Sequence, residues 1–361
     1  METKKILVTG SLGYIGSVLT PYLTKNNYEC IGYDTGFFKD CILYLPEEQK
    51  TVFKDVRQMA EYDLKDIDVL IHLAGISNDP FGKLKSEEVY DPTLNYSLRL
   101  AEICKKLGVK FIFASSCSIY GKASEGILTE DSPANPQTPY SMNKLQIEDG
   151  LKHITNRDFS PIMLRFATVF GPSPRMRFDL FINMFAGMAL TMNKIVLNSD
   201  GKAWRPNIYI KDVLKSVKYA MEYDPLDSEP IVLNVGDNSA NFRVIDITNM
   251  FKEILPKVEI TFLLKENFKP SSSDYELIKD KKIQDGVDKR TYKVSFEKIK
   301  KTFKGFHCDW PVKKGIKNLI KILAATELTE KKFKDINFYR LQKFEYLFQH
   351  RYISKELYWN K

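Results

Sequence analysis

The chain of 361 residues has few histidines and few cysteines. The four histidines are His72, His153, His307 and His350. They are too few and too scattered to favour a histidine-based metal site or catalytic triad. The five cysteines are Cys30, Cys41, Cys104, Cys117 and Cys308. Their number is odd and no Cys-x-x-Cys pair occurs, so a disulfide framework and a zinc site are both disfavoured. We expect no metal and a reducing, cytoplasmic setting.

Long apolar runs are also lacking. No stretch approaches the ~20 apolar residues that span a bilayer, and the first residues lead into a strand-like run without the pattern of a secretory signal. The net charge is +8, from 54 basic and 46 acidic residues, but no basic helix or nucleic-acid-binding motif accompanies it. We therefore expect no membrane span and no nucleic-acid partner.

The N-terminal residues read as a strand, a glycine turn and a helix. Residues 5–9, Lys-Ile-Leu-Val-Thr, are followed by Gly10, Gly13 and Gly16 and then by an apolar pattern of helical period. Glycines let the backbone turn sharply and approach a pyrophosphate, whose charge the helix N-terminus favours. A turn without a ligand is the alternative, because glycine clusters often have no other role.

Asp34 ends the next strand-like run, about twenty residues after the glycines. A carboxylate at this position accepts a hydrogen bond from a ribose hydroxyl and repels a 2′-phosphate, which favours NAD over NADP. The alternative is an ordinary turn residue at a strand end. Further strand-like runs occur at residues 51–54, 68–74 and 110–115, separated by helical stretches, one of which is expected to begin at Asp91. This alternation predicts an α/β fold with a Rossmann-type doubly wound parallel sheet.

Tyr140 and Lys144 are spaced one helical turn apart, in Tyr-Ser-Met-Asn-Lys. A tyrosine titrates near ~10, and a neighbouring positive charge lowers that pKa toward the working pH, which would make the tyrosine an acid/base group. The same spacing recurs twice later in a chain of 19 tyrosines, so the pattern alone is more typical of a solvated helix face. The context of the motif in the rest of the sequence has to decide between the two.

These motifs come in the order and spacing of one family. They are Gly10-x-x-Gly13-x-x-Gly16, Asp34, Asp55-Val56, Leu73-Ala74-Gly75, Ser115-Ser116 and Tyr140-x-x-x-Lys144. As a set, over roughly residues 4–325, they resemble the extended short-chain dehydrogenases/reductases. The chain looks like an NAD-dependent nucleotide-sugar epimerase/dehydratase similar to UDP-glucose 4-epimerase.

The resemblance implies a role for each matched residue. Tyr140 would take a proton from a sugar hydroxyl, Lys144 would hold the cofactor ribose and lower the tyrosine pKa, and Ser116 would hydrogen-bond the reacting oxygen. The implied NAD contacts are Gly10, Gly13, Tyr14, Ile15 and Gly16 at the pyrophosphate, Asp34 at the ribose, Asp55 and Val56 at the adenine, and Leu73, Ala74, Gly75, Ser115, Tyr140 and Lys144 along the groove. Asn95 matches a polar position behind the lysine, with an exposed helix residue as an equal alternative.

The substrate implied by the resemblance is a nucleotide-diphosphate sugar. Arg205 and Arg290 fall where the family has arginines that grip the diphosphate, and the planar guanidinium suits phosphate oxygens. A surface salt bridge is the alternative for each. Thr168 stands where the family usually has asparagine, and Ser77 and Asn78 belong to a loop that should face the sugar.

Three reactions share hydride abstraction from the sugar, usually at C4. The 4,6-dehydratases place an Asp-Glu pair directly after the strand-end hydroxyl residue, where this chain has Cys117 and Ser118. We therefore favour epimerisation, with a C4 dehydrogenase or 4-keto reductase as the alternative. Dehydration and a non-catalytic NAD-binding protein are less favoured.

Three segments are expected along the chain. Residues 1–172 should form the NAD-binding domain, with returns to its sheet near residues 205–240, and residues 173–330 should form most of a smaller substrate-binding domain. Residues 331–361 alternate aromatic and basic side chains, which predicts a helical extension used for packing or dimer contact. We expect a homodimer.

Overall fold

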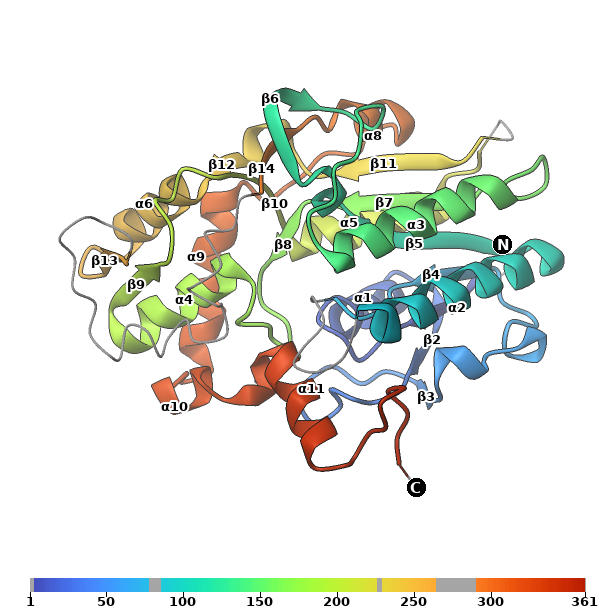
Figure 1. The fold of residues 1–361 in the computed structure, drawn as a ribbon, viewed down its shortest axis with the longest axis horizontal. Helices are drawn as coiled ribbons and strands as arrows, with labels where there is room; N and C mark the ends of the chain where they lie inside the picture. The colour runs from blue at the N-terminus through green and yellow to red at the C-terminus, as the bar shows by residue number, and fades with distance from the viewer. Residues whose placement is uncertain (1–2, 78–85, 226–228, 264–289, 361) are drawn as a thin grey trace.

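The computed structural model describes residues 3–77, 86–225, 229–263 and 290–360. A seven-stranded sheet forms the centre of the N-terminal half (Figure 1). Its strand order is β11-β7-β5-β4-β1-β2-β3, and every neighbouring pair is parallel. The strands are β1 (Lys5–Thr9), β2 (Glu29–Asp34), β3 (Thr51–Phe53), β4 (Val69–His72), β5 (Lys110–Ser116), β7 (Ile162–Phe166) and β11 (Ile231–Val235). The predicted doubly wound parallel sheet is confirmed.

Helices cover both faces of this sheet, which explains why its strands are almost continuously apolar. Side chains alternate between faces along β1: Ile6 and Val8 pack in one cluster, and Leu7 packs in another. The first cluster includes side chains of α1 (Gly16–Lys25), α5 (Ile210–Glu222) and α8 (Glu297–Thr302). The second includes side chains of α2 (Ser86–Leu107) and α3 (Pro139–Ile154).

One predicted boundary was wrong. The helix expected to begin at Asp91 begins at Ser86, so Pro92 lies inside α2 rather than in its first turn. Proline has a backbone φ compatible with a helix, and its missing N–H removes one hydrogen bond. The apolar side chains farther along α2, such as Leu100 and Cys104, are fully buried, and this packing supports the helix beyond the proline.

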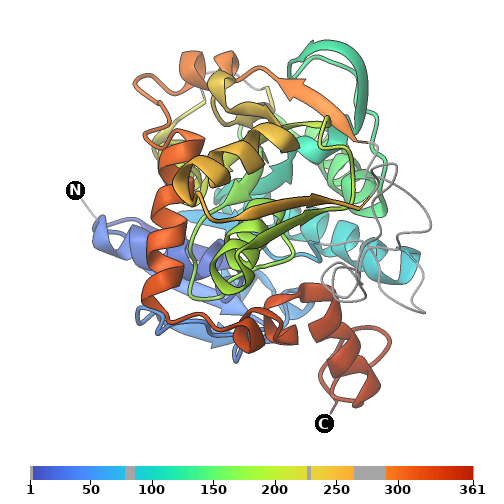
Figure 2. The same cartoon turned by 90° about the vertical axis from the view of Figure 1, so that its left-hand side faces the viewer.

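The second half of the molecule is built from small sheets and helices around an aromatic-rich core. Its strands are β8 (Thr168–Phe170), β10 (Trp204–Tyr209) and β12 (Asn241–Arg243) in one sheet, β9 (Lys194–Leu197) with β13 (Glu259–Phe262), and β6 (Lys122–Leu128) with β14 (Thr291–Val294). Its helices are α4 (Phe181–Met192), α6 (Val244–Ile254) and α9 (Val312–Ala325). Figure 2 shows α9 running along this half of the molecule.

The C-terminal segment returns to the N-terminal half. It contains α10 (Glu330–Phe333), a short 3₁₀ turn at Ile336–Phe338, and α11 (Arg340–Gln349). Its rings and carbonyl groups contact Phe37 and Phe38, which follow β2, and Arg57, which follows β3. Across the ranges that the structure describes, no helix is both long and apolar enough to cross a membrane.

Candidate active site

A cavity of about 490 Å³ opens at the carboxyl ends of the central strands. Residues that follow β1, β2, β4, β5 and β7 form one side of it. Residues of the β8–α4 region, β10, β14 and the C-terminal segment form the other side. Parallel sheets bind ligands at this edge, next to the point where strand order reverses, which here lies between β1 and β4.

The turn that contains Gly10, Gly13 and Gly16 lines the cavity with backbone atoms. Gly10 has a φ of +72°, in the left-handed region that favours glycine. A Cβ added there would lie 2.9 Å from the backbone nitrogen of Ala74, and one added at Gly16 would collide with the carbonyl oxygen of Gly10. Because α1 begins at Gly16, its first N–H groups face this space. The turn therefore has no room for a side chain at Gly10 or Gly16.

Asp34 lies at the end of β2 and lines the cavity. Its carboxylate accepts hydrogen bonds from the backbone N–H groups of Leu12, at 2.9 Å, and Gly36, at 2.7 Å. Burial raises the pKa of Asp34, and these two bonds oppose that rise. The two bonds fix the orientation of the carboxylate, as a contact to a ribose hydroxyl requires.

Asp55 and Val56 also line the cavity, beyond Asp34. The Asp55 side chain accepts from the backbone N–H of Arg57 at 2.8 Å and forms an ion pair with the Arg57 guanidinium. Leu73, Ala74 and Gly75, which follow β4, also line the cavity.

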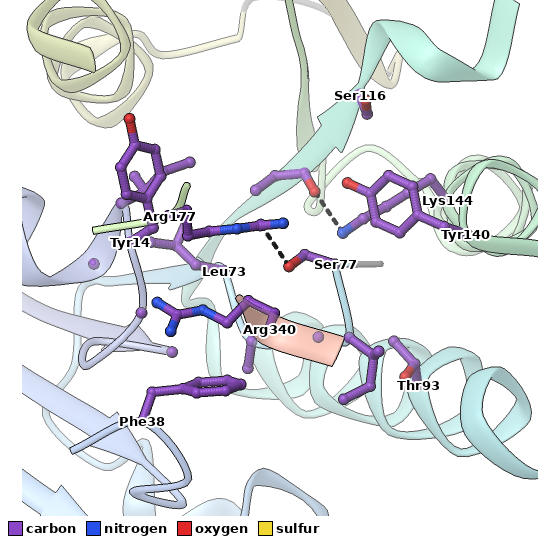
Figure 3. A pocket seen from close by; sticks show the side chains of 18 of the residues that line it. Tyr14, Phe38, Leu73, Ser77, Thr93, Ser116, Tyr140, Lys144, Arg177 and Arg340 are labelled. Carbon is purple, nitrogen blue, oxygen red and sulfur yellow. Dashed lines mark hydrogen bonds between the residues drawn. The ribbon is translucent and has the colours of Figure 1, made fainter. Parts of the chain in front are cut away.

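Tyr140 and Lys144 share one face of the first turns of α3. The helix begins after Thr138, whose hydroxyl accepts from the backbone N–H of Ser141 at 3.2 Å. The Lys144 Nζ lies 5.8 Å from the centre of the Tyr140 ring and donates to the Ala114 carbonyl oxygen at 2.8 Å. Figure 3 shows both side chains pointing to the same side. Burial lowers the pKa of Lys144 to about 8, and Glu148 opposes this shift.

The two strand-end serines have different surroundings. Ser115 donates to Glu148, which forms a buried ion pair with Arg165 at 2.7 Å. Ser116 caps the 3₁₀ turn Cys117–Tyr120, and its Oγ accepts from the backbone N–H of Ser118 at 3.1 Å. Both serines line the cavity with Tyr140.

Cys117 and Ser118 occupy the positions where a dehydratase needs an acid and a base. The Cys117 thiol is 1% exposed, donates to the Arg165 carbonyl oxygen at 3.1 Å, and has a pKa raised by burial. It is therefore a packed side chain that faces the core. Ser118 lines the cavity, and its Oγ has no hydrogen-bond partner within the described part of the chain.

Two arginines meet at the substrate end. Arg205, on β10, donates to the Trp204 carbonyl oxygen at 2.9 Å and also to the carbonyl oxygen of Arg290. Both arginines line the cavity, as does Thr168 at the start of β8. Two positively charged groups from separate elements thus face one ligand space.

Three further predicted residues have different outcomes. Ser77 lines the cavity and accepts from the Arg177 guanidinium at 2.8 Å. Asn78 lies outside the described residues. Asn95 does not line the cavity: its side chain is exposed, whereas Thr93 and Tyr96 of the same helix line it. The expected position of Asn95 behind the lysine is therefore not observed.

Sequence reasoning missed most of the residues from the far side of the cavity. They are Arg177 and Asp179 before α4, Phe37 and Phe38 after β2, and Arg340, Phe344, Glu356 and Leu357 near the chain end. A signal for the first pair was available, because Arg175-Met-Arg177-Phe-Asp179 directly follows the loop expected to pass the nicotinamide.

These residues fit a bound dinucleotide. The glycine turn offers backbone N–H groups to a diphosphate, and the fixed carboxylate of Asp34 lies beside it at the strand end. The Lys144 ammonium lies farther along the same cavity, at the end where the nicotinamide half would extend.

Comparison with known proteins agrees with this fit. The model of the NAD dependent epimerase/dehydratase family matches residues 6–236. The uncharacterised UDP-glucose epimerase YtcB of Bacillus subtilis is 30% identical over 67% of this chain and 80% of its own length. Among solved structures, the NDP-hexosamine 5,6-dehydratase TunA is 23% identical, covering 90% of this chain and 99% of that one, with a TM-score of 0.74.

A second solved structure is the UDP-glucuronic acid 4-epimerase of Bacillus cereus in complex with UDP-glucuronic acid and NAD. It is 25% identical, with 89% of this chain and 99% of that chain covered and a TM-score of 0.69. The cofactor of the present chain is accordingly NAD, and the protein is an enzyme. The chain belongs to the NAD-dependent epimerase/dehydratase family.

Proposed function

We propose that this enzyme epimerises a nucleotide-diphosphate sugar by transient oxidation, with C4 as the reacting carbon. The observation that carries the proposal is the position of Tyr140, Lys144 and Ser116 in the same cavity as the glycine turn and two arginines. One cavity thus offers groups for a cofactor, a sugar alcohol and a diphosphate. The relatives named as epimerases of UDP-sugars support the same reaction.

In the proposed mechanism Tyr140 takes the proton from the sugar hydroxyl. The nearby Lys144 ammonium favours the phenolate over the phenol, and its bond to the Ala114 carbonyl holds it in place. Ser116 hydrogen-bonds the reacting oxygen. Bound NAD supplies the acceptor for the hydride of the same carbon. Tyr140 returns the proton when the opposite face of the keto sugar is reduced.

The diphosphate of the substrate is assigned to Arg205 and Arg290. Arg205 is buried and lines the cavity wall. Its planar donors suit the paired oxygens of a diphosphate. Ser77 and Thr168 line the same space and are proposed sugar contacts.

Two other outcomes of the same first step were considered. A C4 dehydrogenase or 4-keto reductase would use the same three catalytic residues and release the product after one hydride transfer. Dehydration is less favoured, because it needs a separate acid and base, and the thiol of Cys117 is directed into the core. The likeness to a dehydratase at 23% identity concerns the fold.

The test uses a panel of UDP-, GDP-, CDP- and dTDP-sugars that carry deuterium at C4. An epimerase should return the same hydride, so its product should have unchanged mass, inverted configuration by NMR, and deuterium retained at C4. A dehydratase product would be lighter by one water, and a dehydrogenase would accumulate one reduced cofactor per product. Loss of the C4 deuterium to solvent would contradict the mechanism. Tyr140→Phe is the inactive control.

A further inference from the structure

The far wall of the cavity is formed in part by the chain end. Arg340, Phe344, Glu356 and Leu357 line it together with Phe37 and Phe38, which follow β2. All four residues come more than a hundred positions after residue 236, where the match to the family model ends. They therefore lie outside the part of the chain that the family model matches.

The chain end forms hydrogen bonds with residues close to Asp34 and Asp55, which are expected to contact the ribose and the adenine. The Arg57 guanidinium, which pairs with Asp55, donates to the carbonyl oxygens of Glu356 at 2.5 Å and Leu357 at 2.8 Å. The same guanidinium lies 3.5 Å from the centre of the Tyr358 ring. Near Asp34, the indole N–H of Trp359 donates to the Thr35 carbonyl oxygen at 2.6 Å.

Aromatic packing adds a second attachment. The Phe344 ring meets Phe37 and Phe38 at centroid distances of 5.5 and 5.0 Å, both in edge-to-face geometry. Residues 340–360 therefore lie beside the end of the cavity that Asp34 and Asp55 line.

Arg340 is the charged residue that this segment brings to the cavity. It is 3% exposed, and its guanidinium lies 4.0 Å from the centre of the Phe38 ring. In the described part of the chain the guanidinium donates two hydrogen bonds, to the carbonyl oxygens of Asn337 at 3.5 Å and Arg175 at 3.3 Å. Both bonds are long, and a guanidinium has five N–H donors.

The charges around Arg340 do not neutralise it. Arg175 and Arg177 both disfavour its charged form, and burial lowers its pKa to about 10. The carboxylate of Asp179 favours the charge but already pairs with the Arg177 guanidinium through bonds of 2.9 and 3.0 Å. A buried guanidinium with weak hydrogen bonds and cationic neighbours fits an anionic ligand.

The position of Arg340 indicates which anionic group of the ligands it would bind. Its ring neighbour Phe38 comes four residues after Asp34, and Arg340 and Asp34 line the same cavity. Figure 3 shows Arg340 beside Phe38 and away from Tyr140 and Lys144. The anionic group of NAD is its diphosphate, which joins the two nucleosides beside the glycine turn. The arginines assigned to the substrate diphosphate, Arg205 and Arg290, come from β10 and the residue before β14.

We propose that Arg340 binds the diphosphate of NAD opposite the glycine turn, so that residues 340–360 close the cavity over the adenosine half of the cofactor. This proposal does not depend on which sugar the enzyme uses. It predicts that the cofactor is retained between turnovers, because its release requires the chain end to detach from Arg57, Thr35 and Phe37.

The test compares Arg340→Ala and Arg340→Lys with Arg351→Ala, which removes the same charge from an exposed site in the same segment. Affinities are measured for NAD, for ADP-ribose, for adenosine, and for UDP in the presence of saturating NAD. Arg340→Ala should weaken NAD and ADP-ribose by about 10- to 100-fold, the loss expected for charge-assisted hydrogen bonds. Arg340→Lys should weaken them less, since the charge remains but the planar fork is lost. Arg351→Ala should match the unaltered protein.

Adenosine and UDP separate the possible causes. Adenosine has no phosphate, so Arg340→Ala should leave its affinity unchanged; an equal loss for adenosine and ADP-ribose would mean that the variant merely displaces the segment, which overturns the proposal. A loss for UDP with NAD unaffected would place Arg340 at the substrate diphosphate, which also overturns it. Unchanged NAD affinity in Arg340→Ala would do the same.

A measurement on the unaltered protein covers the case in which the variants do not fold. Amide hydrogen exchange in residues 340–349 should slow more when ADP-ribose binds than when adenosine binds. Equal exchange with and without ADP-ribose would contradict a contact between Arg340 and the diphosphate. Neither readout depends on turnover, so failure of the proposed epimerase reaction would leave this test intact.

Discussion

The two sides of the cavity are built differently. The side formed by the first 150 residues presents backbone and short motifs: the glycine turn at Gly10, the fixed carboxylate of Asp34, and a tyrosine–lysine pair on one helix. The side formed by later residues presents long charged side chains, among them Arg177, Arg205 and Arg340.

This difference separates the chemistry from the choice of ligand. A backbone turn without space for a Cβ accepts only glycine, and a helix fixes the phenol and the ammonium at one spacing. Arginine side chains have several rotatable bonds and recognise any phosphate or carboxylate that reaches them. We expect changes on the first side to abolish function and changes on the second to retune affinity.

The largest expected effect is on the first side. Tyr140→Phe keeps the ring and removes the hydroxyl that exchanges the proton, so kcat should fall by about 10²- to 10⁴-fold. NAD affinity should be retained, because the cofactor's diphosphate and adenosine contacts are elsewhere in the cavity. Stopped assays of sugar conversion and a separate NAD titration measure the two quantities. Unchanged turnover would remove Tyr140 from the mechanism.

A second change on that side tests the glycine turn. Gly10→Ala places a Cβ 2.9 Å from the Ala74 nitrogen at a φ of +72°, so the turn must shift. We expect NAD affinity to fall by about 10- to 100-fold as bonds from backbone N–H groups to the phosphate lengthen. Gly108→Ala is the matched control, since Gly108 has a φ of +70° but no atom within 4 Å of the added Cβ. Equal NAD affinity in the two variants would contradict the assigned turn.

The two sides of the cavity also differ in how well the sequence predicts their residues. The glycine turn, Asp34 and Tyr140 with Lys144 could be located because local dihedral and spacing requirements define them. Arg340 could not, since its place depends on how a segment about 300 residues away packs against the residues that follow β2 and β3. The homodimer, the cytoplasmic location and the domain boundaries stay predictions.

Asn95 was misplaced for a different reason. Thr93, Ser97, Leu100, Ala101 and Cys104 are buried along α2, at the spacing of one helix face. Asn95 lies two positions from Thr93 and so belongs to the opposite, exposed face. This periodicity was present in the sequence and favours the exposed helix residue, which was one of the two equal alternatives for Asn95.

On the second side, Arg205→Ala should raise KM for the nucleotide sugar by about 10- to 100-fold and change kcat little, because the lost contact is with the non-reacting diphosphate. Arg243→Ala on the neighbouring strand β12 is the control, since its guanidinium pairs with Asp246 and does not line the cavity. Initial rates over a range of substrate concentrations separate the two constants. A fall in kcat at constant KM would move Arg205 from binding to catalysis.

The smallest expected effect is a pH dependence that belongs to the first side. Burial lowers the pKa of Lys144 to about 8, so its ammonium is present below that pH and is lost as pH rises through it. Because the ammonium favours the Tyr140 phenolate, kcat/KM should decline above about pH 8, by roughly tenfold per pH unit at most. Lys144→Arg keeps the charge at all these pH values, and any activity it retains should show no decline between pH 8 and 9. If the profile of the unaltered enzyme stays flat across that interval while circular dichroism shows an intact fold, the charge of Lys144 does not control the phenol.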